Sequence, residues 1–212
     1  MSRLIDEGLE KLTVLVYRMG EVAETVMTIS FNGFINGKDT TTSVHDLSEM
    51  LSAMSVEVEN KAFELIAKYQ PVASDLRIIN SYMKIAYDFE RYGRYAWDIS
   101  LTHKKFAALA KCAKSDETML KLIQEVTAMV SKSVEALKLH DAKLAESLAS
   151  IEEEVDKIFF AYLDKLTTAK EKTKFIMCNL LVSRYLERIA DHTTYVAESI
   201  IYIVTGKKMS VR

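Results

Sequence analysis

Proline and glycine are scarce in this sequence, which has one proline and six glycines among 212 residues. Because these residues interrupt helices and mark turns, their scarcity predicts a few long helices rather than many short elements. No stretch shows the alternation of apolar and polar residues that a half-buried strand requires. We therefore expect an all-α fold.

Cysteine, net charge and long apolar runs are also in short supply. The two cysteines, Cys112 and Cys178, form no CxxC pair, so we expect free thiols in a cytoplasmic protein. A net charge of only −2 argues against nucleic-acid binding. The longest apolar runs, such as 200–204, are too short to span a membrane, and residues 1–12 lack a signal-peptide pattern.

Sequence motifs of the common catalytic and metal sites are missing as well. The chain contains no GxxxxGK, GxSxG or HExxH motif and no Glu-x-x-His pair of the di-iron bundles. Its four histidines follow no recurring spacing, and we expect each to be a surface or capping residue: His45, His103, His140 and His192. We therefore expect that the protein is not an enzyme.

What the sequence does contain is apolar residues at spacings of three and four, typical of amphipathic helices. We expect six long helices over about residues 3–31, 42–69, 71–109, 116–138, 141–167 and 171–205. Their core positions should include Ile79, Met83, Phe89, Ile176, Leu180 and Leu186. Short connections make successive helices antiparallel neighbours, which predicts two tandem three-helix bundles, residues 1–110 and 115–212.

An internal repeat supports this division. Residues 84–101 and 181–199 align when the pair Glu90-Arg91 is placed on Glu187-Arg188, and apolar positions then fall on apolar positions. Gly93 is matched by Ala190, so we expect a close approach of helices at this point. A repeat of this kind indicates a duplicated supersecondary unit whose halves pack together.

Two pairs of acids in the second half form a candidate metal site: Glu152 with Asp156, and Glu187 with Asp191. Residues four apart lie on one face of a helix, and an antiparallel fifth and sixth helix would bring the two pairs together. Four converging carboxylates repel one another unless a multivalent cation binds. Oxygen ligands favour a hard cation, such as iron as Fe³⁺, Mn²⁺, Mg²⁺ or Ca²⁺.

Two other interpretations of these acids stay open. The pairs are also compatible with an ordinary solvated acidic face, and Arg184 and Arg188 are placed to neutralise the second pair as ion pairs. A set of aromatic residues in the third helix is best explained by core packing together with an exposed partner surface: Tyr82, Tyr87, Phe89, Tyr92, Tyr95 and Trp97.

Two longer segments carry a family resemblance: YLERIADHTTYVAESIIYIVTGK at 185–207 and KYQPVASDLRIINSYMKIAYDFERYGRYA at 68–96. They closely resemble the corresponding stretches of the PhoU family of phosphate-uptake regulators, and the resemblance covers both repeats. It implies two three-helix bundles related by an internal pseudo-twofold axis, and a non-enzymatic role. Some members of the family bind iron or other metals through E/D-x-x-x-D motifs.

The two repeats differ in how well they keep that metal motif. The second repeat keeps it in Glu187 and Asp191, and in Glu152 and Asp156, although Tyr195 stands where the family often has Asn. In the first repeat Glu90 is present, but Arg94 stands where Asp is expected, and the acids of the second helix are replaced near Ser48 and Ser52. We expect the first site to be lost, or replaced by Arg94 pairing with Glu90 or Asp98.

The function implied by the resemblance is a regulatory adaptor that holds phosphate uptake and phosphate signalling in check. Its implied partners are the ATPase subunit of a phosphate ABC transporter and, in many bacteria, a sensor histidine kinase. Two alternatives stay open: a metal-binding bundle, which Arg94 disfavours, and an accessory subunit of a different phosphate transporter. We expect a cytoplasmic protein that reaches the membrane only through its partners, with a homodimer among its assemblies.

Overall fold

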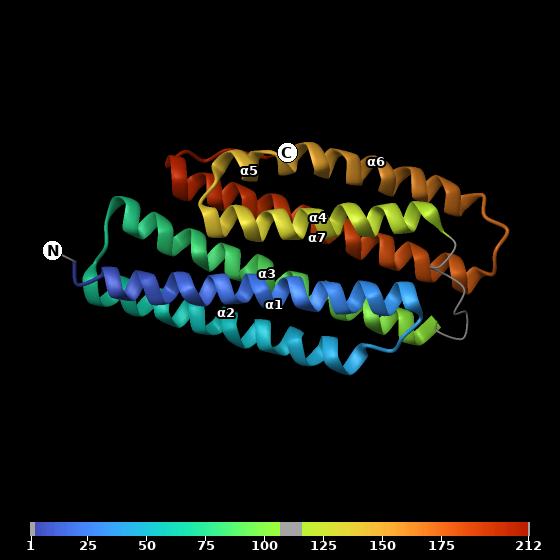
Figure 1. The fold of residues 1–212 in the computed structure, drawn as a ribbon, viewed down its shortest axis with the longest axis horizontal. Coiled ribbons are helices and arrows are strands. Elements are labelled where there is room, and N and C mark those ends of the chain that lie inside the picture. Colours follow the sequence, from blue (N-terminus) through green and yellow to red (C-terminus); the bar gives the residue numbers. More distant parts are fainter. Residues whose placement is uncertain (1–2, 107–115, 212) are drawn as a thin grey trace.

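The computed structural model describes residues 3–106 and 116–211, and the regular structure in these ranges is entirely helical (Figure 1). The helices are α1 (Asp6–Asn36), α2 (Thr41–Tyr69), α3 (Ala73–Phe106), α4 (Glu117–Leu139), α5 (Ala142–Glu146), α6 (Leu148–Thr167) and α7 (Thr173–Thr205). Helices α1–α3 form one bundle and α4–α7 form the other, side by side along the long axis. The expected fold of two three-helix bundles is confirmed.

The fifth expected helix is interrupted, so residues 3–106 and 116–211 contain seven helices rather than the expected six. Helix α5 ends before Ser147, and α6 begins at Leu148. Ser147 lies between the two helices, and its hydroxyl donates a hydrogen bond to the Leu144 carbonyl at 2.7 Å. The expected single helix 141–167 is therefore wrong at this residue, and α5 and α6 together take its place.

The ends of two other helices differ from expectation. Gly33 does not end α1, which continues to Asn36 and is capped by Gly37 at a φ of 69°. A Cβ on Gly33 would lie 2.5 Å from Thr40 Oγ1, so this glycine instead allows the following loop to fold back on the helix. Helix α3 begins at Ala73 rather than at Pro71: Gln70 ends α2 with a φ of 47°, and Ala73 also has a positive φ, of 49°, so residues 70–72 form a turn between the two helices.

The hydrophobic core is continuous through both bundles. Tyr92 and Tyr162 are fully buried, and the Tyr92 hydroxyl lies 3.4 Å from Ser133 Oγ of the second bundle. Of the six expected core residues, Ile79, Phe89 and Leu186 are buried and Met83 and Ile176 are half-buried, but Leu180 is wrong because 42% of it is exposed. The expected boundary at 111–115 lies outside the described residues.

Two packing features complete the frame. A Cβ on Gly93 of α3 would lie 2.7 Å from Leu51 Cδ1 and 3.3 Å from Ser48 Cα of α2, so the expected close approach at this glycine is confirmed. Helix α3 makes its most extensive contact with α7 of the other bundle. None of the helices in residues 3–106 and 116–211 is both long and apolar enough to cross a membrane.

Candidate functional site

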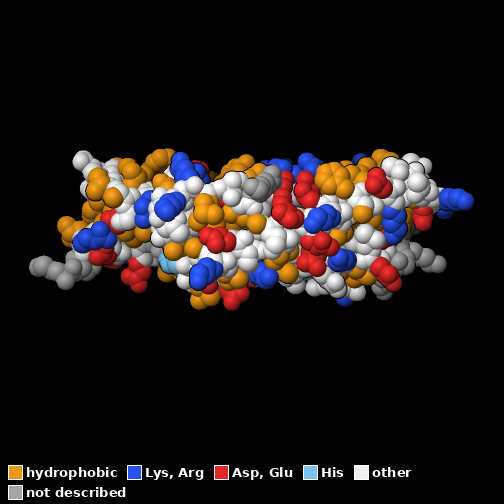
Figure 2. All heavy atoms as spheres, turned by 90° about the horizontal axis from the view of Figure 1, so that it is seen from above, with side chains coloured by type: hydrophobic (Ala, Val, Ile, Leu, Met, Phe, Trp, Pro, Cys, Tyr) orange, Lys and Arg blue, Asp and Glu red, His pale blue; other side chains and the backbone are white. Residues whose placement is uncertain are grey.

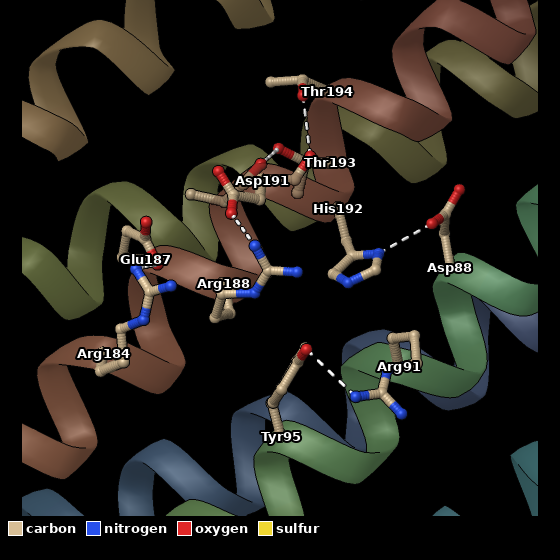
Figure 3. Close-up of polar contacts among 11 residues, drawn as sticks. Asp88, Arg91, Tyr95, Arg184, Glu187, Arg188, Asp191, His192, Thr193 and Thr194 are labelled. Carbon is tan, nitrogen blue, oxygen red and sulfur yellow. Dashed lines mark hydrogen bonds and ion pairs between the residues drawn. The ribbon is translucent and has the colours of Figure 1, made fainter.

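The seam between α3 and α7 joins the two bundles and holds most of the residues singled out by the sequence (Figure 3). Asp88 of α3 contacts His192 of α7, and Tyr95 of α3 stacks on Tyr185 of α7. Residue numbers therefore rise along one helix and fall along the other, which shows that the two helices run antiparallel. In the repeat alignment Asp88 corresponds to Tyr185 and Tyr95 corresponds to His192. The two contacts are therefore equivalent across the pseudo-twofold axis, one polar and one aromatic.

The polar member of this pair is buried. His192 Nδ1 lies 2.8 Å from Asp88 Oδ1, and the two side chains are only 5% and 6% exposed. Burial raises the pKa of Asp88, and the hydrogen bond to His192 opposes that rise. The expectation that His192 is a surface or capping residue is thus wrong. The signal that would have found it is its alignment with Tyr95, a core position of the first repeat.

Two arginines surround the aromatic member of the pair. Arg91 Nη2 donates to the Tyr95 hydroxyl at 3.1 Å, and its guanidinium lies 4.9 Å from the ring centroid. Burial raises the pKa of Tyr95, but Arg91 and Arg188 outweigh this and leave it below its usual value. Figure 3 shows Arg91 and Arg188 on opposite helices beside Tyr95.

The two acids of α7 are each engaged by an arginine of the same helix. Arg184 Nη1 lies 2.6 Å from Glu187 Oε2, and Arg188 Nη1 donates to Asp191 Oδ2 at 2.6 Å (Figure 3). Asp191 is buried, and the Glu187 side chain is only 12% exposed. The ion-pair interpretation therefore describes these two acids in this conformation.

The two acids of α6 lie on the neighbouring helix. Glu152 is buried and Asp156 is half-buried. Burial raises the pKa of Glu187, Arg184 and Arg188 oppose that rise, and the charge of Asp156 adds to it. Asp156 and Glu187 are thus within electrostatic reach of each other.

These four acids do not form a ready-made ligand set. In the ranges that the structure describes, no three His, Cys, Asp or Glu side chains are grouped closely enough to hold one metal ion. A cation at these acids would require the two arginine pairs to open. Metal binding by Glu152, Asp156, Glu187 and Asp191 stays a prediction.

The first repeat is arranged differently. The Arg94 guanidinium lies 4.8 Å from the Trp97 ring centroid, and it helps to oppose the burial that raises the pKa of Asp98. Glu90 Oε1 accepts a hydrogen bond from the Ser52 hydroxyl at 3.3 Å. Within the described ranges Arg94 makes no ion pair with Glu90 or Asp98, so the expected direct pairing is wrong and stacking on the indole takes its place.

The aromatic residues of α3 divide as the sequence suggested. Tyr82, Phe89, Tyr92 and Tyr95 are buried, Trp97 is half-buried, and Tyr87 is 54% exposed. Tyr87 is therefore the member of the set that is best placed to meet a partner. We call the surface around this exposed side chain the open side of the seam.

The chain matches the family model of the PhoU domain twice, over residues 16–102 and 119–200. A "Phosphate-specific transport system accessory protein PhoU homolog" of Clostridium acetobutylicum is 31% identical, over 99% of this chain and 98% of that protein. A protein of the same description from Caulobacter vibrioides is 32% identical, over 96% of this chain and 91% of that protein.

Solved structures agree with these matches. The crystal structure of PhoU from Pseudomonas aeruginosa superposes with a TM-score of 0.91 at 25% identity, over 96% of this chain and all of that one. The phosphate transport system regulatory protein PhoU of Streptococcus pneumoniae shares the fold, with a TM-score of 0.86 at 21% identity, over 97% of this chain and 99% of that one. The chain belongs to the PhoU family.

Proposed function

We propose that this protein is a cytoplasmic accessory regulator of a phosphate-specific transport system, which limits phosphate uptake and phosphate signalling by contact. The supporting observation is the match of PhoU domains to both bundles, together with relatives described as accessory proteins of that system over nearly the whole chain. The partner is the ATPase subunit of a phosphate ABC transporter. A sensor histidine kinase is a second partner in the same system.

The shape and surface of the protein suit action by contact. Two bundles that share one continuous core form a stiff body, which can hold a partner in place without chemistry of its own. Figure 2 shows one face on which acidic and basic side chains are interspersed, so recognition there depends on matched local contacts rather than on a field of one sign. We place the partner surface at the open side of the seam, around Tyr87.

The test is an affinity pull-down from phosphate-replete cells, with mass spectrometry of the captured proteins. Wild-type protein should capture the ATPase subunit of a high-affinity phosphate transporter. Tyr87→Ala should reduce capture by about tenfold, as expected for an aromatic residue central to an interface. Phe63→Ala is the matched control, because Phe63 is 59% exposed on α2, and it should capture normally.

Two outcomes of the pull-down would contradict parts of the proposal. Capture of the components of a different, low-affinity phosphate transporter would favour the alternative of an accessory subunit of that system. Equal loss with Tyr87→Ala and Phe63→Ala would contradict the placement of the partner surface. A homodimer is part of the proposal as well, and sedimentation of the purified protein tests it.

Metal binding is a second candidate property, favoured by the buried acids Glu152 and Asp191 on adjacent helices. We propose a hard cation such as iron, Mn²⁺, Mg²⁺ or Ca²⁺ as the ligand, since only oxygen donors are available there. Binding would have to displace Arg184 and Arg188 from their acids, which makes it a competition between a cation and two guanidinium groups.

A further inference from the structure

A groove of about 650 Å³ lies between the first half of α3 and the second half of α7. The chain after α7 turns back along that helix (Figure 1). Its residues Lys208 and Met209 form one wall of the groove. The Val211 amide donates a hydrogen bond to Glu198 Oε1 at 3.1 Å. Small-molecule sites in proteins span about 300–1,000 Å³, so the groove is large enough for a ligand. Its polar and aromatic lining includes Ser81, Lys84, Tyr87, Tyr195, Tyr202 and Lys208.

An unused hydrogen-bonding group lies in this lining. Ser81 is only 1% exposed, and its hydroxyl makes no hydrogen bond to another protein group among the described residues. A serine within a helix ordinarily bonds a carbonyl one turn back, as Ser133 does to Val130. A buried hydroxyl without a partner costs free energy, and a ligand that bonds it would recover that cost.

Two lysines and three carboxylates line the groove. Lys84 and Lys208 form no ion pair with any described residue, and Lys208 instead lies 5.8 Å from the Tyr202 ring centroid. Two of the three acids in the lining are already engaged, Asp88 by His192 and Glu198 by the Val211 amide. The third, Glu59, is exposed on α2. A hydrogen bond does not remove the charge of Glu198, so the lining as a whole is not positive, and an anionic group is attracted only locally, by the two lysines.

The two repeats differ at three positions of the groove lining, Ser81, Lys84 and Glu198. In the repeat alignment Ser81 corresponds to Cys178, Lys84 to Leu181, and Glu198 to Leu101. The equivalent end of the seam thus carries a thiol and two leucines where the groove carries a hydroxyl, an ammonium group and a carboxylate. Leu101 and Leu181 are 36% and 37% exposed, so these positions lie at the surface in both halves, and the crossing of the two helices does not require a charged residue there.

We propose that this groove binds a nucleoside monophosphate or a molecule of the same chemistry, a planar ring joined to a phosphate. The phosphate lies between Lys84 and Lys208, and the Ser81 hydroxyl bonds the ligand at the floor. The ring packs against Tyr87, which is 54% exposed at the groove wall, since aromatic side chains stack well on planar rings. Tyr87 also lies at the proposed partner surface, but ligand binding to the purified protein can be measured without the transport partner.

The test is calorimetric titration of the purified full-length protein with AMP, adenosine and inorganic phosphate as separate probes. AMP should bind at one site per chain, and both fragments should bind at least about tenfold more weakly, because each lacks one half of the recognised chemistry. Failure of AMP to bind would overturn the proposal. Equal binding of phosphate would overturn the role of the ring, and equal binding of adenosine would overturn the role of the lysines.

Variants locate the site. Lys84→Gln should weaken AMP binding by about tenfold, because a charge-assisted contact is lost. Ser81→Ala should also weaken binding, yet it should leave the thermal midpoint of the unliganded protein unchanged or higher, since its hydroxyl bonds no protein group. Lys174→Gln, an exposed lysine on α7 outside the groove, is the control. Equal affinity in wild type and Lys84→Gln would overturn the assignment.

Discussion

Single residues decide how the two bundles recognise each other, and the buried pair of Asp88 and His192 is the clearest case. Removing one partner leaves the other without its hydrogen bond in the interior, so His192→Ala should lower the free energy of unfolding by about 3 kcal/mol. Urea denaturation of His192→Ala, Asp88→Ala and the double variant measures the coupling between the two side chains. A coupling energy near zero would contradict this description of the seam.

Metal binding is also decided by single residues. Asp191→Ala should abolish binding of Mn²⁺ or iron by the second repeat, because it removes a buried ligand together with its charge. Glu90→Ala should leave metal binding unchanged, since Arg94 places a positive charge one turn away. Arg94→Asp should restore at most weak binding, because Ser48 and Ser52 supply no carboxylates. Calorimetric titration of each variant with the metal ion compares their binding. Equal metal stoichiometry in wild type and Asp191→Ala would rule out the assignment of the metal site to the second repeat.

At the scale of helices, the contact of α2 with α3 depends on Gly93. Gly93→Leu should lower the free energy of unfolding by about 1–3 kcal/mol, because the new side chain meets Leu51 and the backbone of Ser48. Gly93→Ala should cost less, since Leu51 Cδ1 is the end of a flexible side chain and the Ser48 backbone, 3.3 Å from the new Cβ, needs to shift only slightly. Thermal unfolding of both variants checks this order, and an undiminished midpoint for Gly93→Leu would contradict the close approach.

The start of α4 depends on Asp116, whose carboxylate accepts the amides of Thr118 and Met119 and pairs with Lys165 at 3.0 Å. Burial raises the pKa of Asp116, but Lys165, the Met119 amide and Tyr162 outweigh it and leave the pKa below its usual value. The stabilisation is therefore present above the unfolded pKa of about 3.9 and is lost as the pH falls through the lower native value.

The pH dependence of one variant tests this. Asp116→Asn keeps a capping oxygen but loses the charge, so it should be less stable than wild type at pH 7. The difference should shrink as the pH falls below about 4. Denaturation midpoints at pH 7 and pH 3 measure it, and a difference that does not change with pH would show that the charge contributes nothing.

For the whole molecule, the helices follow from local patterns of apolar residues, and their grouping into two bundles follows from the short connections between them. The interruption at Ser147 was missed because nothing local distinguishes this serine from Ser133, whose hydroxyl makes the same kind of backbone bond inside an unbroken helix. Leu180 and His192 were misplaced for one reason. Their burial depends on how α3 and α7 cross, and helical periodicity does not contain that information.

The candidate site was predictable only as a set of residues. The spacing of Glu187 and Asp191 placed both on one helical face, but the competition between Arg188 and a cation depends on side-chain conformation. The groove at Ser81 and Lys84 has no sequence motif at all. It arises where α3 and α7, which are far apart in the sequence, meet the segment that follows α7.

The central claim is that this protein restrains phosphate uptake, and uptake of radiolabelled phosphate by phosphate-replete cells tests it most directly. Cells that lack the protein should continue to take up phosphate when it is plentiful, and cells that regain the wild-type chain should stop. Restoration by Tyr87→Ala should be incomplete, and restoration by Phe63→Ala should be full. Equal uptake with and without the protein would contradict the account.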